Sequence, residues 1–97
     1  MATYVVLCNY TDQGIRNVKE SPKRRAAARE LGKQLGVDMK AAYLAMGTYD
    51  LVLILEAATD DAVAKWTLST ASKGNVRTTT IKVFPETEMD NILAAIA

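Results

Sequence analysis

The stretch Gly47-Thr48-Tyr49-Asp50-Leu51-Val52-Leu53-Ile54-Leu55-Glu56 decides the fold, because a turn and an acidic residue lead into an unbroken run of large aliphatic residues. A β-strand alternates its side chains between two faces, so Leu51, Leu53 and Leu55 point one way and Val52 and Ile54 the other. Both faces of this predicted strand therefore require burial. A single layer of helices covers only one of them. We expect the other face to meet a second copy of the chain, which predicts an obligate oligomer.

The rest of the chain alternates between strand and helix patterns. The predicted strands are residues 4–10, 37–46, 51–55 and 75–84. The predicted helices are a short one after Thr11, a second from Ser21 to a stop at Gly36, a third from Thr59 to Lys73, and a terminal one over 86–96. This order predicts a single α+β domain over residues 1–97. Its architecture is the ferredoxin-like βαββαβ arrangement, with a four-stranded antiparallel sheet, helices on one face and a short C-terminal helix.

Several residues carry local predictions about these helices. Ile15 and Val18 are expected to form the buried stripe of the first helix. Ser21 is expected to cap the second helix, with Pro22 in its first turn, where proline is tolerated. Trp66 is expected to lie on the apolar stripe of the third helix.

Composition and charge limit the classes of partner. A net charge of +1 gives no electrostatic reason to bind nucleic acid or an anionic membrane. The longest apolar run is too short for a membrane span, and the first strand starts so close to Met1 that we expect no signal peptide and a cytoplasmic protein. The single cysteine, Cys8, agrees with a reducing compartment, and its place within a strand predicts a small buried apolar side chain.

Histidine is absent from the chain. This excludes a Ser-His or Cys-His nucleophile pair, a zinc site with two histidines on one helix, and an imidazole ligand for haem iron. A lone cysteine makes no thiolate cage either. We therefore predict no metal and no cofactor, and the balance of these observations is against an enzyme.

The chain resembles the GYD domain family over essentially its whole length. The resemblance is carried by Gly47, Tyr49 and Asp50 before the aliphatic strand, and by residues 74–80 before the last strand. It extends to the opening segment 11–16 and to Glu20-Ser21-Pro22 with the nearby Arg25; Thr48 is the one departure. The resemblance implies a ferredoxin-like domain that pairs into a dimeric α/β barrel, and it leaves the biochemical role open.

A candidate ligand site follows from strand alternation. If Leu51 and Ile81 face the helices, four polar residues lie on the open face of the sheet: Tyr10, Asp50, Thr80 and Lys82. There they would bind a small ligand such as an anion. The alternative is that the aspartate pairs locally at its turn, that the threonine only suits a strand, and that the lysine extends into water.

Three classes of function remain at this point. The first is a homo-oligomer that associates through the sheet face bearing Val6, Val52 and Ile54 and binds a small ligand or partner. The second is a cofactor-independent monooxygenase or isomerase, since enzymes of the dimeric-barrel type place an asparagine on the first strand and a tryptophan on a helix, as Asn9 and Trp66 would be. The third is a structural subunit of a larger assembly. A basic stripe over residues 23–33 is interpreted as a solvated helix face.

Overall fold

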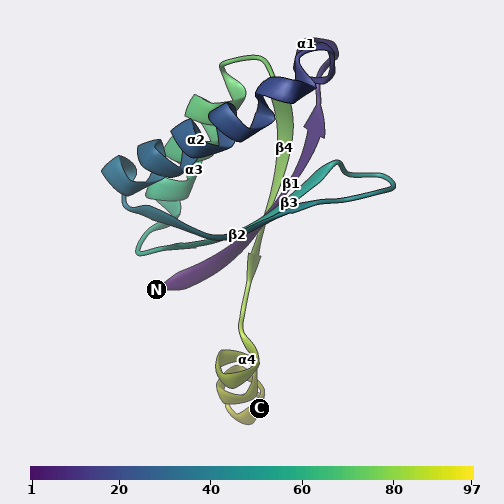
Figure 1. Cartoon of the computed structure of the whole chain (residues 1–97). Helices are drawn as coiled ribbons and strands as arrows, with labels where there is room; N and C mark the ends of the chain where they lie inside the picture. Colours follow the sequence, from purple (N-terminus) through teal and green to yellow (C-terminus); the bar gives the residue numbers. More distant parts are fainter.

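Four strands form one antiparallel sheet in the computed structural model, which describes residues 1–97 (Figure 1). The order across the sheet is β2-β3-β1-β4, so β3 and β1 are central and the other two are edges. The strands are β1 (Ala2–Tyr10), β2 (Val37–Leu44), β3 (Leu51–Ala57) and β4 (Val76–Val83). The hairpin of β2 and β3 and the central position of the aliphatic strand are both as predicted.

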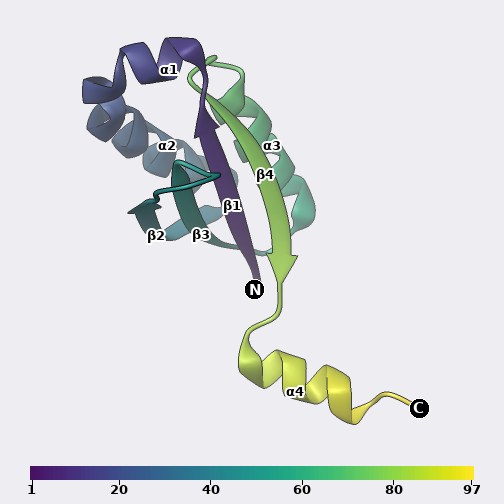
Figure 2. The ribbon, with the colours of Figure 1, turned by 90° about the vertical axis from the view of Figure 1, so that its right-hand side faces the viewer.

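The helical segments are α1 (Asp12–Arg16), the short 3-10 turn η1 (Val18–Glu20), α2 (Ser21–Leu35), α3 (Asp60–Ala71) and α4 (Glu86–Ala94). The two longest of them lie on one face of the sheet (Figures 1 and 2). Helices α2 and α3 form the covering layer, and α4 stands apart from it. The predicted α+β, ferredoxin-like order of elements is confirmed.

The hydrophobic core lies between the sheet and the helices α2 and α3. Burial alternates along the central strands: Tyr4, Val6 and Cys8 of β1 are buried, as are Leu53 and Leu55 of β3. The helices contribute Val63 and Trp66 of α3, with Leu31 and Leu35 of α2 packed against them. The predicted helix-facing set on β3 is therefore confirmed.

The predicted faces of β4 and of Val6 are wrong. Val6 pairs with Thr80, and Tyr4 with Lys82. Directly opposite residues of an antiparallel pair project to the same side of a sheet, so Thr80 and Lys82 lie on the helix side. Ile81, which pairs with Val5, lies on the open side instead. The apolar residues of this edge strand thus point away from the helices, toward the face that no helix of the chain covers.

Helix boundaries follow local signals in part. The Thr11 side chain accepts a hydrogen bond from the Gly14 N–H and caps α1, as predicted. Ile15 and Val18 are exposed, however, and the buried residue of α1 is Gly14, which packs against Asn75 in the loop before β4. Ser21 is not a cap either, since it is the first residue of α2 and its hydroxyl bonds elsewhere.

Helix α4 extends from the end of β4 as a separate arm (Figure 2). Pro85 precedes its first turn, where it stops the strand as predicted. One set of residues on the arm is apolar and exposed: Met89, Ile92, Leu93 and Ile96. A helix with an apolar side normally packs that side against another element, which the arm does not do within this chain. No helix of the chain has the length and apolar character needed to cross a membrane.

Candidate functional site

Two of the segments that carry the family resemblance, residues 11–16 and 74–80, are hydrogen-bonded to each other. The Thr11 N–H donates to the Asn75 carbonyl at 3.1 Å, and the Thr11 hydroxyl donates to the carbonyl of Gly74. The Gln13 side-chain amide donates to the Lys73 carbonyl at 3.1 Å. A Cβ atom on Gly14 would lie 1.9 Å from the Asn75 carbonyl oxygen, so only glycine permits this approach. The opening segment is thereby fixed against the loop before β4.

Asp50 lies just before β3 and is hydrogen-bonded to the backbone of β1. Its Oδ2 atom accepts a hydrogen bond from the Tyr10 N–H at 2.9 Å, and its own N–H donates to the Cys8 carbonyl at 2.8 Å. The carboxylate thus satisfies the first backbone donor of β1 that lies beyond the paired residues of β3. This arrangement matches the local pairing that the sequence left as an alternative.

A polar chain links β1 to the start of α2. The Tyr10 hydroxyl lies 3.2 Å from the Ser21 Oγ, which also accepts from Arg24 Nη2 at 3.1 Å. Arg24 further donates to the carbonyls of Asn17 at 2.9 Å and Gly14 at 3.3 Å. Its guanidinium is half-buried, so the prediction of a wholly solvated basic stripe is wrong at this residue. Arg24 is partly buried because it contacts α1 and the residue after it, and a local sequence pattern does not predict such a tertiary contact.

A cavity of about 160 Å³ lies next to the hydrogen bonds of Tyr10, Ser21 and Arg24, and it is bounded by α2, α3 and the helix side of the sheet. Its wall is mostly apolar, with Ala28 and Leu31 from α2, Leu51 and Leu53 from β3, and Trp66 from α3. Its polar lining residues are Tyr10, Ser21, Arg24, Arg25, Thr70, Lys73 and Asn75. No carboxylate lines it.

Three residues of the cavity wall carry polar groups whose protonation or hydrogen bonding the structure defines. Burial raises the pKa of the Cys8 thiol to about 11, so it stays protonated at neutral pH and behaves as the predicted apolar side chain. The Trp66 Nε1–H donates to the Ala28 carbonyl at 2.8 Å, which confirms its place in the core. The Thr70 Oγ1 is buried and has no hydrogen-bond partner in the protein.

A second group of polar residues occupies an open depression beside α3. The Tyr4 hydroxyl donates to Asp60 Oδ1, and Lys82 Nζ lies 3.1 Å from the same oxygen. The hydrogen bond to Asp60, with burial, raises the pKa of Tyr4 to about 12. The hydrogen bonds from Tyr4 and Lys82 lower the pKa of Asp60. Lys82 is therefore already paired within the chain.

The four predicted ligand residues do not form one site. Tyr10 lines the cavity, Thr80 and Lys82 line the open depression, and Asp50 bonds to backbone. The prediction that they lie together on the open face is wrong for Tyr10, Thr80 and Lys82, because both β1 and β4 present their even-numbered residues to the helices. The role of these residues in binding stays a prediction. Arg25 and Lys73 line the cavity and were not predicted as site residues.

The oxygenase hypothesis rests on Asn9 and Trp66, but these two residues lie on opposite sides of the sheet. Asn9 pairs with Arg77 and follows the odd-numbered residues of β1 to the open face, whereas Trp66 lies among the helices. A shared oxygenase-type site would require Asn9 on the helix side of the sheet, and Asn9 lies on the open side. The structure does not bring the two residues together.

The fold is similar to that of known regulators. It matches the feast or famine regulatory protein of Mycobacterium tuberculosis, complexed with L-methionine, with a TM-score of 0.66 and 18% identity over 88% of this chain and 51% of that one. It matches FFRP-DM1 with a TM-score of 0.59 and 23% identity over 87% of this chain and 100% of the other. This chain spans about half the length of the mycobacterial protein. At these identities the likeness defines a ferredoxin-like domain and no more.

Sequence comparison identifies the family. The GYD domain model matches residues 4–93, and the chain belongs to this family, as the resemblance of its motifs predicted. A relative from Thermus thermophilus, named glutamine synthetase and cystathionine beta-lyase binding protein, is 34% identical over 90 residues, which cover 92% of this chain and 95% of the relative. The name of that relative describes binding to other proteins.

Proposed function

We propose that this protein is a self-associating binding protein, which pairs with a second copy through the open face of its sheet and binds a partner protein as an assembly. The observation that carries the proposal is the open face itself. Its middle is aliphatic across three strands, with Val5, Leu7, Val52, Ile54, Ile81 and Val83. No helix of the chain covers it (Figure 1).

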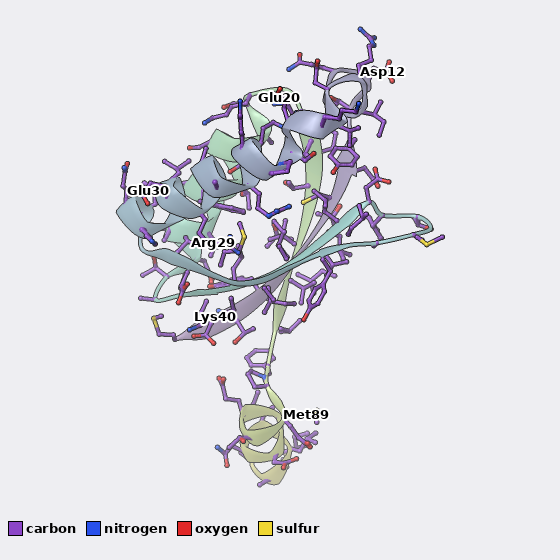
Figure 3. The ribbon with its side chains drawn as sticks, in the orientation of Figure 1. Asp12, Glu20, Arg29, Glu30, Lys40 and Met89 are labelled. Atoms are coloured by element: carbon purple, nitrogen blue, oxygen red, sulfur yellow. The ribbon has the colours of Figure 1, made fainter.

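Charged residues lie on the open side at both ends of this apolar area. Arg77 of β4 pairs with Asn9 at one end, and Glu56 of β3 pairs with Asp38 at the other. Lys40 lies 3.0 Å from Asp38 and 3.9 Å from Glu56, on the outer half of the β2–β3 pair (Figure 3). An apolar centre with a charged rim is the usual anatomy of a protein interface. Burying each large aliphatic side chain contributes about 1.5–3 kcal/mol, which favours a closed pair over an exposed sheet.

The arm α4 supports a second copy as the occupant of the open face. The arm leaves the end of β4 and carries its apolar residues clear of its own domain (Figures 2 and 3). In a symmetric pair of face-to-face sheets each arm reaches the other copy, so both unpartnered apolar surfaces are covered at once. This pairing is the dimeric α/β barrel that the sequence predicts.

The proposed job of the assembly is protein binding. Its support is the Thermus relative, which has nearly the same length and is named for binding two enzymes. We propose that this protein likewise binds the glutamine synthetase or the cystathionine beta-lyase of its own organism.

Sedimentation velocity tests the binding proposal with purified components. The full chain is mixed at micromolar concentration with glutamine synthetase and, separately, with cystathionine beta-lyase from the same organism. We expect at least one enzyme to move to a larger sedimentation coefficient while carrying this protein. A chain that forms its own pair but sediments apart from both enzymes would restrict it to a structural role and contradict the proposed partners.

A further inference from the structure

We propose that the cavity between the helices and the sheet is a binding site for a small organic acid with an aromatic or branched aliphatic body. The site lies on the opposite side of the sheet from the proposed self-association surface. The inference therefore stands independently of the proposed function. It rests on the size of the cavity, on the chemistry of its wall, and on the charges at its polar end.

Size and wall define the body of the ligand. A volume of about 160 Å³ is close to that of an apolar protein cavity known to hold benzene, about 150 Å³. Tryptophan, leucine and alanine side chains supply most of the apolar part of the wall, and the neutral thiol of Cys8 adds a further apolar group. An aromatic ring or a short branched chain matches this space, whereas a sugar or a nucleotide would bury unpaired hydroxyl groups.

Charge at the polar end defines the head group. Arg24, Arg25 and Lys73 line the cavity, and none of them forms a salt bridge within the chain. Arg24 bonds only to carbonyl and hydroxyl oxygens. The acidic residues of α2 and of the turn before it, Glu30 and Glu20, lie on the outer surface and pair with other lysines (Figure 3). Three uncompensated cations facing one apolar cavity favour an anionic ligand.

Neutral polar groups at the cavity complete the recognition set. The Tyr10 and Ser21 hydroxyls are bonded to each other, next to Arg24 and the N-terminus of the long helix α2, whose dipole also favours an anion. Within the wall, the buried Thr70 hydroxyl has no partner in the protein. A carboxylate seated at this end would accept hydrogen bonds from the cations while its apolar body fills the space beneath.

Trp66 makes the site directly observable. It is the only tryptophan of the chain and part of the cavity wall, so ligand entry changes its fluorescence. The probes are phenylacetate and its uncharged counterpart phenylacetamide, titrated into the full-length protein at low ionic strength. We expect saturable quenching or enhancement by phenylacetate, with the amide binding about tenfold more weakly because it lacks the charge.

Two variants and one control assign the binding to this cavity. Arg25 and Lys73 are exposed enough to change without loss of the core, so Arg25→Gln with Lys73→Gln should weaken phenylacetate binding about tenfold and leave the amide unchanged. Lys33→Gln with Lys65→Gln removes the same two charges from exposed positions of α2 and α3 outside the cavity and should leave both ligands unaffected. Ala42→Leu, which fills the cavity, should abolish both signals.

The outcomes that overturn the inference are equally definite. No saturable change with either probe at millimolar concentration would show that the cavity does not take such a body. Equal affinity for phenylacetate and phenylacetamide would show that the cavity has no site for an anionic head group. An equal loss of phenylacetate binding in the control double variant and in the cavity double variant would show that only net charge matters.

Discussion

The two faces of the sheet are both apolar but are covered in different ways. The helix side has a continuous core in which Leu55 and Val6 are wholly inaccessible. The open side carries Ile54 and Ile81, whose side chains keep part of their surface exposed, and Ile81 is 44% exposed. The difference teaches that one chain completes only half of the burial its central strands require. A change on the helix side should therefore destabilise each subunit, whereas a change on the open side should act on association.

The largest effect is expected at Trp66. Trp66→Ala removes a buried ring and its hydrogen bond to the Ala28 carbonyl. Loss of such a side chain costs about 3–5 kcal/mol in free energy of unfolding. Urea denaturation at several protein concentrations should show this loss at each of them. A cost under about 1 kcal/mol would contradict the assignment of the helix side as the stabilising core.

A smaller effect of opposite sign is expected at Thr70. Thr70→Val replaces a buried hydroxyl that has no partner in the protein, so the free energy of unfolding should rise by about 1 kcal/mol. The matched control is Thr67→Val on the same helix, because the Thr67 hydroxyl donates to the Ala64 carbonyl at 3.1 Å. That control should be neutral or destabilising. Destabilisation by Thr70→Val in thermal unfolding would show that the hydroxyl is already satisfied.

The last effect is limited to alkaline pH, where the free energy of unfolding should depend on the ionisation of Tyr4. Folding raises the pKa of Tyr4 from 10.0 to about 12, so the folded state holds this proton more tightly than the unfolded state. The stabilisation is fully present below pH 10 and is lost as the pH rises toward 12. Tyr4→Phe should flatten the fall of stability over this range, while Tyr43→Phe on the exposed part of β2 should not. Equal slopes in chemical denaturation for Tyr4→Phe and the wild type would contradict this linkage.

Elements with local signals were predictable from the sequence. The left-handed Gly36, with φ of 82°, ends α2, and the Thr59 side chain caps α3 by accepting from the Ala62 N–H. The aliphatic run of β3 identified the central strand because both of its faces need burial. Membership of the GYD family was also predictable from short motifs, and the Thr11 segment of these motifs is hydrogen-bonded to residues 74 and 75 of another.

The orientation of β4 was not predictable, because alternation gives two faces but does not say which one meets the helices. The natural assumption placed Ile81 inward. The register with β1 reverses it, since Thr78 pairs with the buried Cys8. The cavity was not predictable either, because its polar end is assembled from Tyr10, Arg24 and Lys73, which come from three distant segments.

Self-association through the open face is the central claim, and sedimentation equilibrium of three proteins tests it most directly. The wild type should be a dimer or larger at micromolar concentration. Ile54→Asp should lower the mass to that of a monomer or unfold the chain, because a charge then lies in the proposed interface. Leu68→Asp makes a similar exchange at a 71% exposed position on α3 and should keep the assembly. A folded wild-type monomer, or an unchanged mass for folded Ile54→Asp, would contradict the account.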